Sequence, residues 1–132
     1  MTPGETLILT RFVKAACPQQ AIDEFTPDAW HDLLSEVRFE DAREAVRTIC
    51  RKQPFIAPAE IIDEVRRIRA KRLHEAPPLV PPDLDPIETI AWLAEARHRI
   101  ADGEEVPDTA RGELKPRHLP DLRELTRKMD NA

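Results

Sequence analysis

The sequence predicts an all-α protein, and three observations favour that fold class. Apolar residues recur every three to four positions in five stretches, which is the period of one face of a helix. Proline stands at the start of four of these stretches, where its fixed φ angle suits the first helical position. No stretch shows the alternation of apolar and polar residues, bounded by turn residues, that is typical of a strand.

The first helix is expected to begin at Pro3, because Thr2 and Glu5 form a capping box, and to stop at Pro18. Its expected buried face consists of Ile8, Leu9, Phe12, Val13 and Ala16. The second helix is expected to begin in the same manner at Thr26 and Pro27. Its expected buried face consists of Ala29, Trp30, Leu33, Leu34 and Val37.

The third helix is expected to begin near Glu40 and Asp41, whose carboxylates suit the positive end of the helix dipole, and to end at Pro54. Its apolar stripe consists of Ala42, Ala45, Val46, Ile49 and Cys50. Pro58 opens a fourth helix with Ile61, Ile62, Val65 and Ile68 on its inner face. Short connections and one apolar stripe on each helix predict a compact four-helix domain over residues 1–74.

Between the third and fourth helices lies a stiff apolar loop that runs from Pro54 to Pro58. A phenylalanine between two prolines favours a side chain that fills the core beneath a sharp turn, which is the role we expect for Phe55. The alternative is that Phe55 is exposed and docks on a partner.

Residues 75–86 are expected to form a Pro-rich linker, extended and semi-rigid. Asp85 and Glu88 then form a capping box for an amphipathic helix over residues 87–102, and Gly103 stands just past its end. This helix is apolar on two sides, so it requires a partner: its own domain, a second copy or another protein. Residues 103–132 are expected to form a flexible tail with a short helix at 120–129.

The net charge of −5 argues against a dedicated nucleic-acid or membrane-surface binder. Cys17 and Cys50 fall on apolar helix faces, which favours two buried free thiols over a disulfide. The N-terminus lacks the pattern of a signal peptide, and no apolar run approaches a membrane span. We therefore expect a cytoplasmic protein that does not bind the membrane.

The sequence indicates no catalytic, metal or cofactor site. The three glycines are scattered and none belongs to a phosphate-binding loop, which excludes an ATPase of the usual loop type. The four histidines are isolated and the two cysteines lie far apart, so no ligand spacing for a metal appears. His31 beside Asp32 could be a base and its orienting group, although an exposed helix face is favoured. Paired carboxylates such as Glu40 and Asp41 are expected to be solvated.

One basic run, at the end of the fourth helix, suggests contact with phosphate. The candidate residues for a DNA backbone are Arg66, Arg67, Arg69, Lys71 and Arg72. Such binding would depend on salt and not on base sequence. The alternative, a solvated helix end whose basic side chains suit the dipole, is favoured.

Three motifs in this order resemble a known family. A proline-started helix carries Asp-Ala-Trp-His-Asp-Leu-Leu at 28–34, Phe-Glu-Asp-Ala at 39–42 leads into Ala45-Val46, and Gln-Pro-Phe-Ile-Ala-Pro-Ala-Glu-Ile stands at 53–61. Over residues 3–72 this resembles the N-terminal domain of the bacteriophage replicative-helicase loader and inhibitor family, and related small proteins of actinobacteria and their phages. The matching positions are Trp30, Leu33, Ala42, Ala45, Phe55, Pro58 and Ile61, mainly expected core residues.

The resemblance implies a helical domain followed by a flexible part that contacts the hexameric, DnaB-type replicative helicase. That contact would hold the helicase inactive until an origin-binding protein releases it, without nucleotide hydrolysis. The helix over residues 87–102 departs from the family pattern. If it nevertheless docks in a groove of the helicase, as would the segment 119–129, the partner-binding residues are Trp92, Leu93, Leu122, Leu125 and Met129.

The sequence therefore predicts a non-enzymatic adaptor that loads or inhibits a replicative helicase. Two alternatives stay open. The first is a small DNA-binding regulator that uses the basic end of helix 58–74. The second is an oligomerising phage assembly protein, in which Trp92 and Leu93 would be buried between copies.

Overall fold

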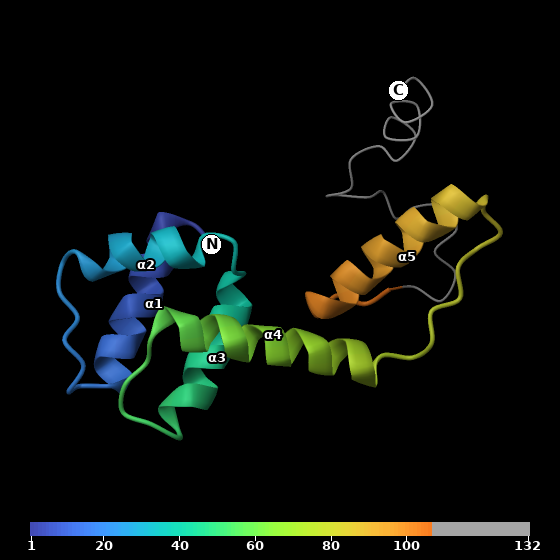
Figure 1. Ribbon diagram of the computed structural model, residues 1–132. Helices are drawn as coiled ribbons and strands as arrows, with labels where there is room; N and C mark the ends of the chain where they lie inside the picture. Colours follow the sequence, from blue (N-terminus) through green and yellow to red (C-terminus); the bar gives the residue numbers. More distant parts are fainter. Residues whose placement is uncertain (107–132) are drawn as a thin grey trace. The chain divides into compact units, whose positions relative to one another are not determined.

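The computed structural model describes residues 1–106, and in that range the protein has five α-helices and no strand (Figure 1). The helices are α1 (Pro3–Ala16), α2 (Thr26–Leu34), α3 (Phe39–Cys50), α4 (Pro58–Glu75) and α5 (Pro86–Ala101). The prediction of an all-α protein is therefore confirmed for the described residues. The predicted helix at 120–129 and most of the predicted tail lie outside the described residues.

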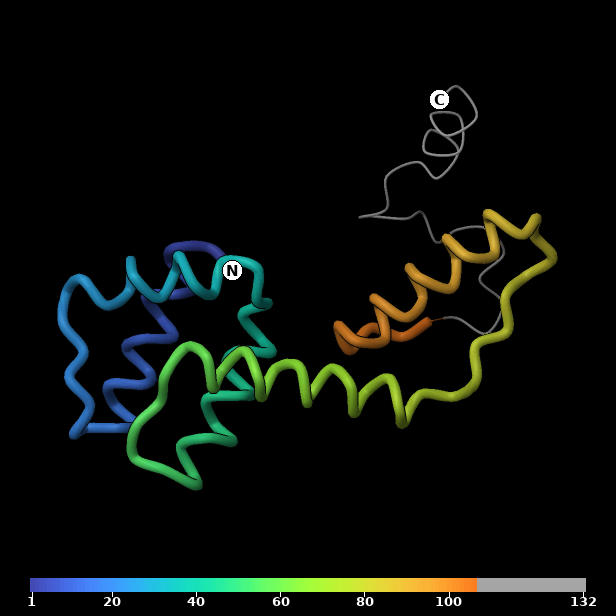
Figure 2. Tube along the Cα trace, in the orientation of Figure 1, coloured from blue at the N-terminus to red at the C-terminus, as the bar shows by residue number. Residues whose placement is uncertain are grey.

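The chain divides into two compact units whose boundary falls inside α4. Unit 1 comprises residues 1–71, and unit 2 begins at Arg72 and includes α5. Figure 2 shows that the trace of α4 continues without a break across this boundary. The last turn of α4 is therefore part of unit 2, although the sequence pattern places it in the N-terminal domain.

Two helix starts are capped as the sequence predicts, and one is not. The capping boxes of Thr2 with Glu5 and of Asp85 with Glu88 are both formed. At α2 the capping group is Asp23 instead of Thr26. The Asp23 carboxylate accepts hydrogen bonds from the backbone N–H of Phe25 and Thr26 and from the Thr26 hydroxyl, at 2.9–3.0 Å. These bonds, the one from the Thr26 hydroxyl first, lower the pKa of Asp23.

The core of unit 1 lies between α1, α2, α3 and the first turns of α4. Its buried apolar residues are Leu9, Val13, Cys17, Trp30, Leu34, Ala42, Ala45, Val46, Ile49, Ile56, Ile61 and Val65. The buried face of α1 differs from the predicted one, because Thr6 and Thr10 point inward while Ile8 and Ala16 are exposed. Each threonine hydroxyl donates to a backbone carbonyl one turn earlier, which allows a polar group to be buried.

The prediction that Phe55 fills the core is wrong, because Phe55 is 52% exposed and its neighbour Ile56 is buried. The Gln20 side chain accounts for the burial of Ile56 in place of Phe55. Its amide accepts from the backbone N–H of Ile56 at 2.8 Å and donates to the backbone carbonyl of Ile56 at 2.7 Å. With the backbone of Ile56 held in this way, its side chain enters the core and that of Phe55 faces solvent. Leu33, also expected inside, is exposed as well.

Glu60 ties this loop to the first turn of α4. Its carboxylate accepts from the backbone N–H of Ala57 at 2.8 Å and from the Gln53 side chain at 2.6 Å. The bond from Gln53, followed by the one from Ala57, lowers the pKa of Glu60 below its ordinary value of 4.5. The charged form of Glu60 is therefore the form that stabilises the loop.

Replacing this carboxylate should loosen the loop. In Glu60→Ala we expect cleavage by chymotrypsin after the exposed Phe55 to be roughly fivefold faster than in the natural protein, because a helix-capping interaction is lost. Asp63→Ala, one turn later and exposed, is the control.

Because the pKa of Glu60 is lowered on folding, the stabilisation by Glu60 is present above about pH 4.5 and is lost as the pH falls through the folded-state pKa. The difference in thermal unfolding midpoint between Glu60→Ala and the natural protein should therefore shrink as the pH falls over that range. Equal rates of chymotrypsin cleavage in Glu60→Ala and the natural protein would contradict the role of Glu60.

Unit 2 is built around Trp92 and Ala96 on one face of α5. Leu79, Leu84, Leu93 and Val106 pack against them. The Pro-rich segment, expected to act as a linker, thus contributes Leu79 and Leu84 to this cluster. The Arg72 guanidinium donates to the carbonyl of Ala101 at 2.9 Å and so satisfies the C-terminal end of α5.

Gly103 allows the chain to turn after α5. Its φ of +81° lies in the left-handed region, and a Cβ atom there would stand 3.6 Å from the Arg72 Cζ. Glycine just past the end of this helix agrees with the prediction, because only glycine adopts this backbone conformation without strain.

Candidate functional site

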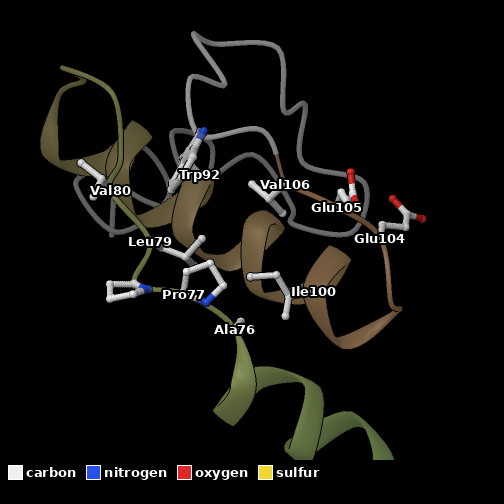
Figure 3. Close-up of a pocket in the computed structure, with 10 residues that line it drawn as sticks. Ala76, Pro77, Leu79, Val80, Trp92, Ile100, Glu104, Glu105 and Val106 are labelled. Carbon is white, nitrogen blue, oxygen red and sulfur yellow. The ribbon is translucent and has the colours of Figure 1, made fainter.

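A hollow of about 830 Å³ opens in unit 2 between the Pro-rich segment and α5. Pro77, Leu79 and Val80 line it on one side, and Trp92 and Ile100 belong to α5. Figure 3 shows Pro77 and Leu79 lying opposite Ile100 and Val106. The hollow is apolar because proline rings and branched aliphatic side chains form most of its wall, and apolar concave surfaces of this size are typical binding sites.

Apolar packing holds Trp92 in this unit. Trp92 is 4% exposed, and its buried indole N–H has no hydrogen-bond acceptor among residues 1–106. Tryptophan in a protein interior usually finds an acceptor for this group. Within the described part of the chain, the position of the ring therefore depends on its contacts with Leu79, Leu84 and Leu93.

The surroundings of the hollow are acidic. Residues 72–106 contain three arginines, no lysine and eight Asp or Glu residues. Glu104 and Glu105 stand at the wall of the hollow. Arg99 is engaged with the buried Glu95 at 2.9 Å, and Arg72 binds the end of α5. The site therefore combines apolar walls with an excess of negative charge.

The structure places the predicted partner-binding residues of α5 inside unit 2. Trp92 is buried, and Leu93 is half-buried against it. The most exposed apolar side chains in the described part of this unit lie elsewhere: Val80 is 74% exposed and Ile90 is 60% exposed. The partner-binding role of Trp92 and Leu93 stays a prediction, and Leu122, Leu125 and Met129 lie outside the described residues. The periodicity of α5 alone could not indicate Val80, because Val80 precedes the helix.

The basic run on α4 is largely occupied by contacts within the protein. Arg66 forms an ion pair with Asp63 at 3.4 Å, and Arg67 forms one with Glu64 at 3.1 Å. Both guanidinium groups remain exposed, so these pairs are weak and can exchange for other anions. Lys71 also takes part in an interaction within the chain.

Arg69 and Arg72 each form a contact within their own unit. Arg69 lies 3.3 Å from Asp41, and Arg72 binds the carbonyl of Ala101. Asp41 is only 1% exposed, so the expectation that it is solvated like Glu40 is wrong. The cause is its position one residue further along α3, where its side chain meets the Arg69 guanidinium. The contact of these arginines with DNA stays a prediction, although their pairing reduces the positive charge available for it.

His31, the candidate base beside Asp32, forms a hydrogen bond with Thr6. Its Nδ1 lies 3.2 Å from the Thr6 hydroxyl, and this hydrogen bond joins α2 to α1. Within residues 1–106 no group of three or more His, Cys, Asp or Glu residues is placed to hold a metal ion. No helix in the same range combines the length and apolar character that crossing a bilayer requires.

The two cysteines, 33 positions apart in the sequence, meet in unit 1. Cys17 and Cys50 are free thiols, and their sulfur atoms lie 3.9 Å apart. The prediction of two free thiols agrees with the structure, but Cys50 is half-buried instead of buried. Their spacing along the chain carried no sign that they are neighbours.

Comparison of the chain with protein-family models, with curated proteins and with solved structures finds no match. The resemblance to helicase loaders and inhibitors therefore stays a prediction.

Proposed function

We propose that the protein is a non-enzymatic adaptor that loads or inhibits a hexameric, DnaB-type replicative helicase in the cytoplasm of a bacterial host. In this proposal a compact four-helix domain carries a C-terminal arm, and an origin-binding protein releases the bound helicase. The observation that carries the binding role is the apolar hollow of unit 2 beside Trp92. The identity of the partner rests on the resemblance over residues 3–72.

The chemistry of the hollow defines the partner segment. Apolar walls favour a segment with aliphatic or aromatic anchors, because burying apolar surface is the main source of affinity. The acidic surroundings favour Lys or Arg beside those anchors. We propose that the hollow receives a basic amphipathic helix of the helicase, in the helix-in-groove mode of recognition.

The charge of the site favours a protein partner over nucleic acid. Residues 72–106 carry eight acidic residues against three arginines, so this part of unit 2 repels a phosphate backbone. The exposed members of the basic run are Arg66, Arg67 and Lys71, and each already takes part in an interaction within the chain. The alternative of self-assembly through Trp92 also has less support, because that ring is already covered within its own unit.

Val80 offers a direct test of this proposal, since it lines the hollow and is 74% exposed. We expect Val80→Lys to weaken binding of the full chain to the host replicative helicase about tenfold, because it removes an apolar contact and opposes a basic partner. Binding is measured by isothermal titration calorimetry and by co-elution in size-exclusion chromatography.

Leu33→Lys is the matched control, because Leu33 is a similarly exposed aliphatic residue in unit 1. It should bind the helicase as tightly as the natural chain does. Equal binding by Val80→Lys would show that the hollow is not the contact. If the natural chain itself fails to co-elute with the helicase, the proposed partner is wrong.

A further inference from the structure

Cys17 and Cys50 are the only cysteines of the chain, and each stands where a helix ends. Cys17 follows the last residue of α1 with φ −123° and ψ 73°, and Cys50 is the last residue of α3. Their sulfur atoms are 3.9 Å apart. Cys17 is fully buried, whereas Cys50 is half-buried and can be reached from solvent.

We propose that Cys17 and Cys50 are a site of reversible oxidation, at which a low-molecular-weight disulfide such as oxidised glutathione converts the two thiols into an intramolecular disulfide. The proposal does not rest on the proposed function. A disulfide requires the sulfurs to approach to about 2.05 Å. Rotation of the two side chains and a small shift of the helix ends would supply the difference, because helix ends yield more readily than helix centres.

The exposure of the two thiols sets the order of the reaction. The Cys50 thiolate attacks one sulfur of oxidised glutathione, the S–S bond of glutathione breaks, and one glutathione leaves as its thiolate. The Cys17 thiol then attacks the Cys50 sulfur and displaces the second glutathione, and the Cys17 proton passes to the glutathione thiolate that leaves. Two electrons pass from the protein to the oxidant, and two molecules of reduced glutathione are formed. Cys17 cannot act first, because its sulfur is covered.

The environment of Cys50 makes the reaction slow at neutral pH. Burial, assisted by the neighbouring Cys17, raises the pKa of Cys50 to about 11. The thiolate is the reacting form, so only a small fraction of Cys50 is reactive near pH 7. The pair would therefore respond to sustained oxidising conditions instead of to a brief pulse.

A disulfide here would join the ends of α1 and α3. It would also restrain the surface loop that contains Phe55, because Gln20, three residues after Cys17, holds the backbone of Ile56. Closing a chain segment of this length should raise the thermal unfolding midpoint by about 10 °C.

The test uses the native full chain, incubated with oxidised glutathione at pH 8.5 and followed by intact mass and peptide mapping. We expect a monomer that has lost two hydrogen atoms, carries a Cys17–Cys50 cross-link, melts at higher temperature and returns to the thiol form with dithiothreitol. The Cys17→Ala variant should accumulate one glutathione on Cys50. The Cys50→Ala variant should remain unmodified.

Three results would overturn the proposal. The first is a natural chain that forms the cross-link only in denaturant. The second is a glutathione that stays on Cys50 of the natural chain, since Cys17 would then be unable to displace it. The third is a disulfide between two molecules. Because the natural chain alone decides among these results, a folding defect in either variant does not affect the test.

Discussion

Asp41→Ala is expected to lower the free energy of unfolding of unit 1 by about 3 kcal/mol, the lower end of the range for breaking a buried ion pair. Asp41 is 1% exposed and lies 3.3 Å from Arg69 and 4.0 Å from Arg38. Both arginines retain contact with solvent, so each can rehydrate in part when the carboxylate is removed. This partial rehydration is the reason for the lower end of the range.

The chain offers a convenient measurement and a matched control for this prediction. The protein has two tryptophans, so in a Trp92→Phe background the fluorescence of Trp30 reports on unit 1 alone. Glu40→Ala removes the preceding carboxylate of α3, which is exposed, and should change the stability by less than about 0.5 kcal/mol. Equal effects of the two substitutions would mean that Asp41 acts only through the helix dipole.

Trp92→Ala is expected to remove most of the stability of unit 2. Truncating a buried tryptophan costs about 3–5 kcal/mol, and Leu79, Leu84, Leu93 and Val106 all belong to the cluster that this ring centres. Since the indole N–H has no acceptor in the described part of the chain, the expected loss is one of packing. We expect the backbone amides of α5 to exchange with solvent at least a hundredfold faster, since every 1.4 kcal/mol changes an equilibrium constant tenfold.

Hydrogen exchange resolved by residue tests this prediction, with the amides of α1 as an internal reference. Ile90→Ala is the control, because Ile90 lies on the same helix and is 60% exposed. It should leave the exchange of α5 nearly unchanged. Unaltered exchange in Trp92→Ala would mean that the packing of Leu79 and Leu84 does not depend on the indole.

Much of the fold could be predicted from local patterns. The starts of α1 and α5 follow from capping boxes, in which residues three positions apart satisfy each other's backbone groups. The turn after α5 follows from Gly103, whose positive φ is disfavoured for other residues. These features depend on neighbours along the chain, so the sequence contains the information needed to place them.

The candidate site could not be predicted in the same way. The hollow of unit 2 depends on Leu79 and Val80, which belong to no helix and show no periodicity. The proximity of Cys17 and Cys50 and the contact of Arg69 with Asp41 join residues at least 28 positions apart. Residue type was misleading as well, since Phe55 is exposed and Asp41 is buried.

The sequence by itself determined that the described chain is all-helical and where its helices begin, because helix formation and capping depend on residues within one turn of each other. Only the tertiary structure decided which faces are buried, which charges are paired and which side chains border the hollow. Those properties depend on packing between segments far apart in the chain. A single hydrogen-bonded contact, such as that of Gln20 with Ile56, can reverse what residue type alone suggests.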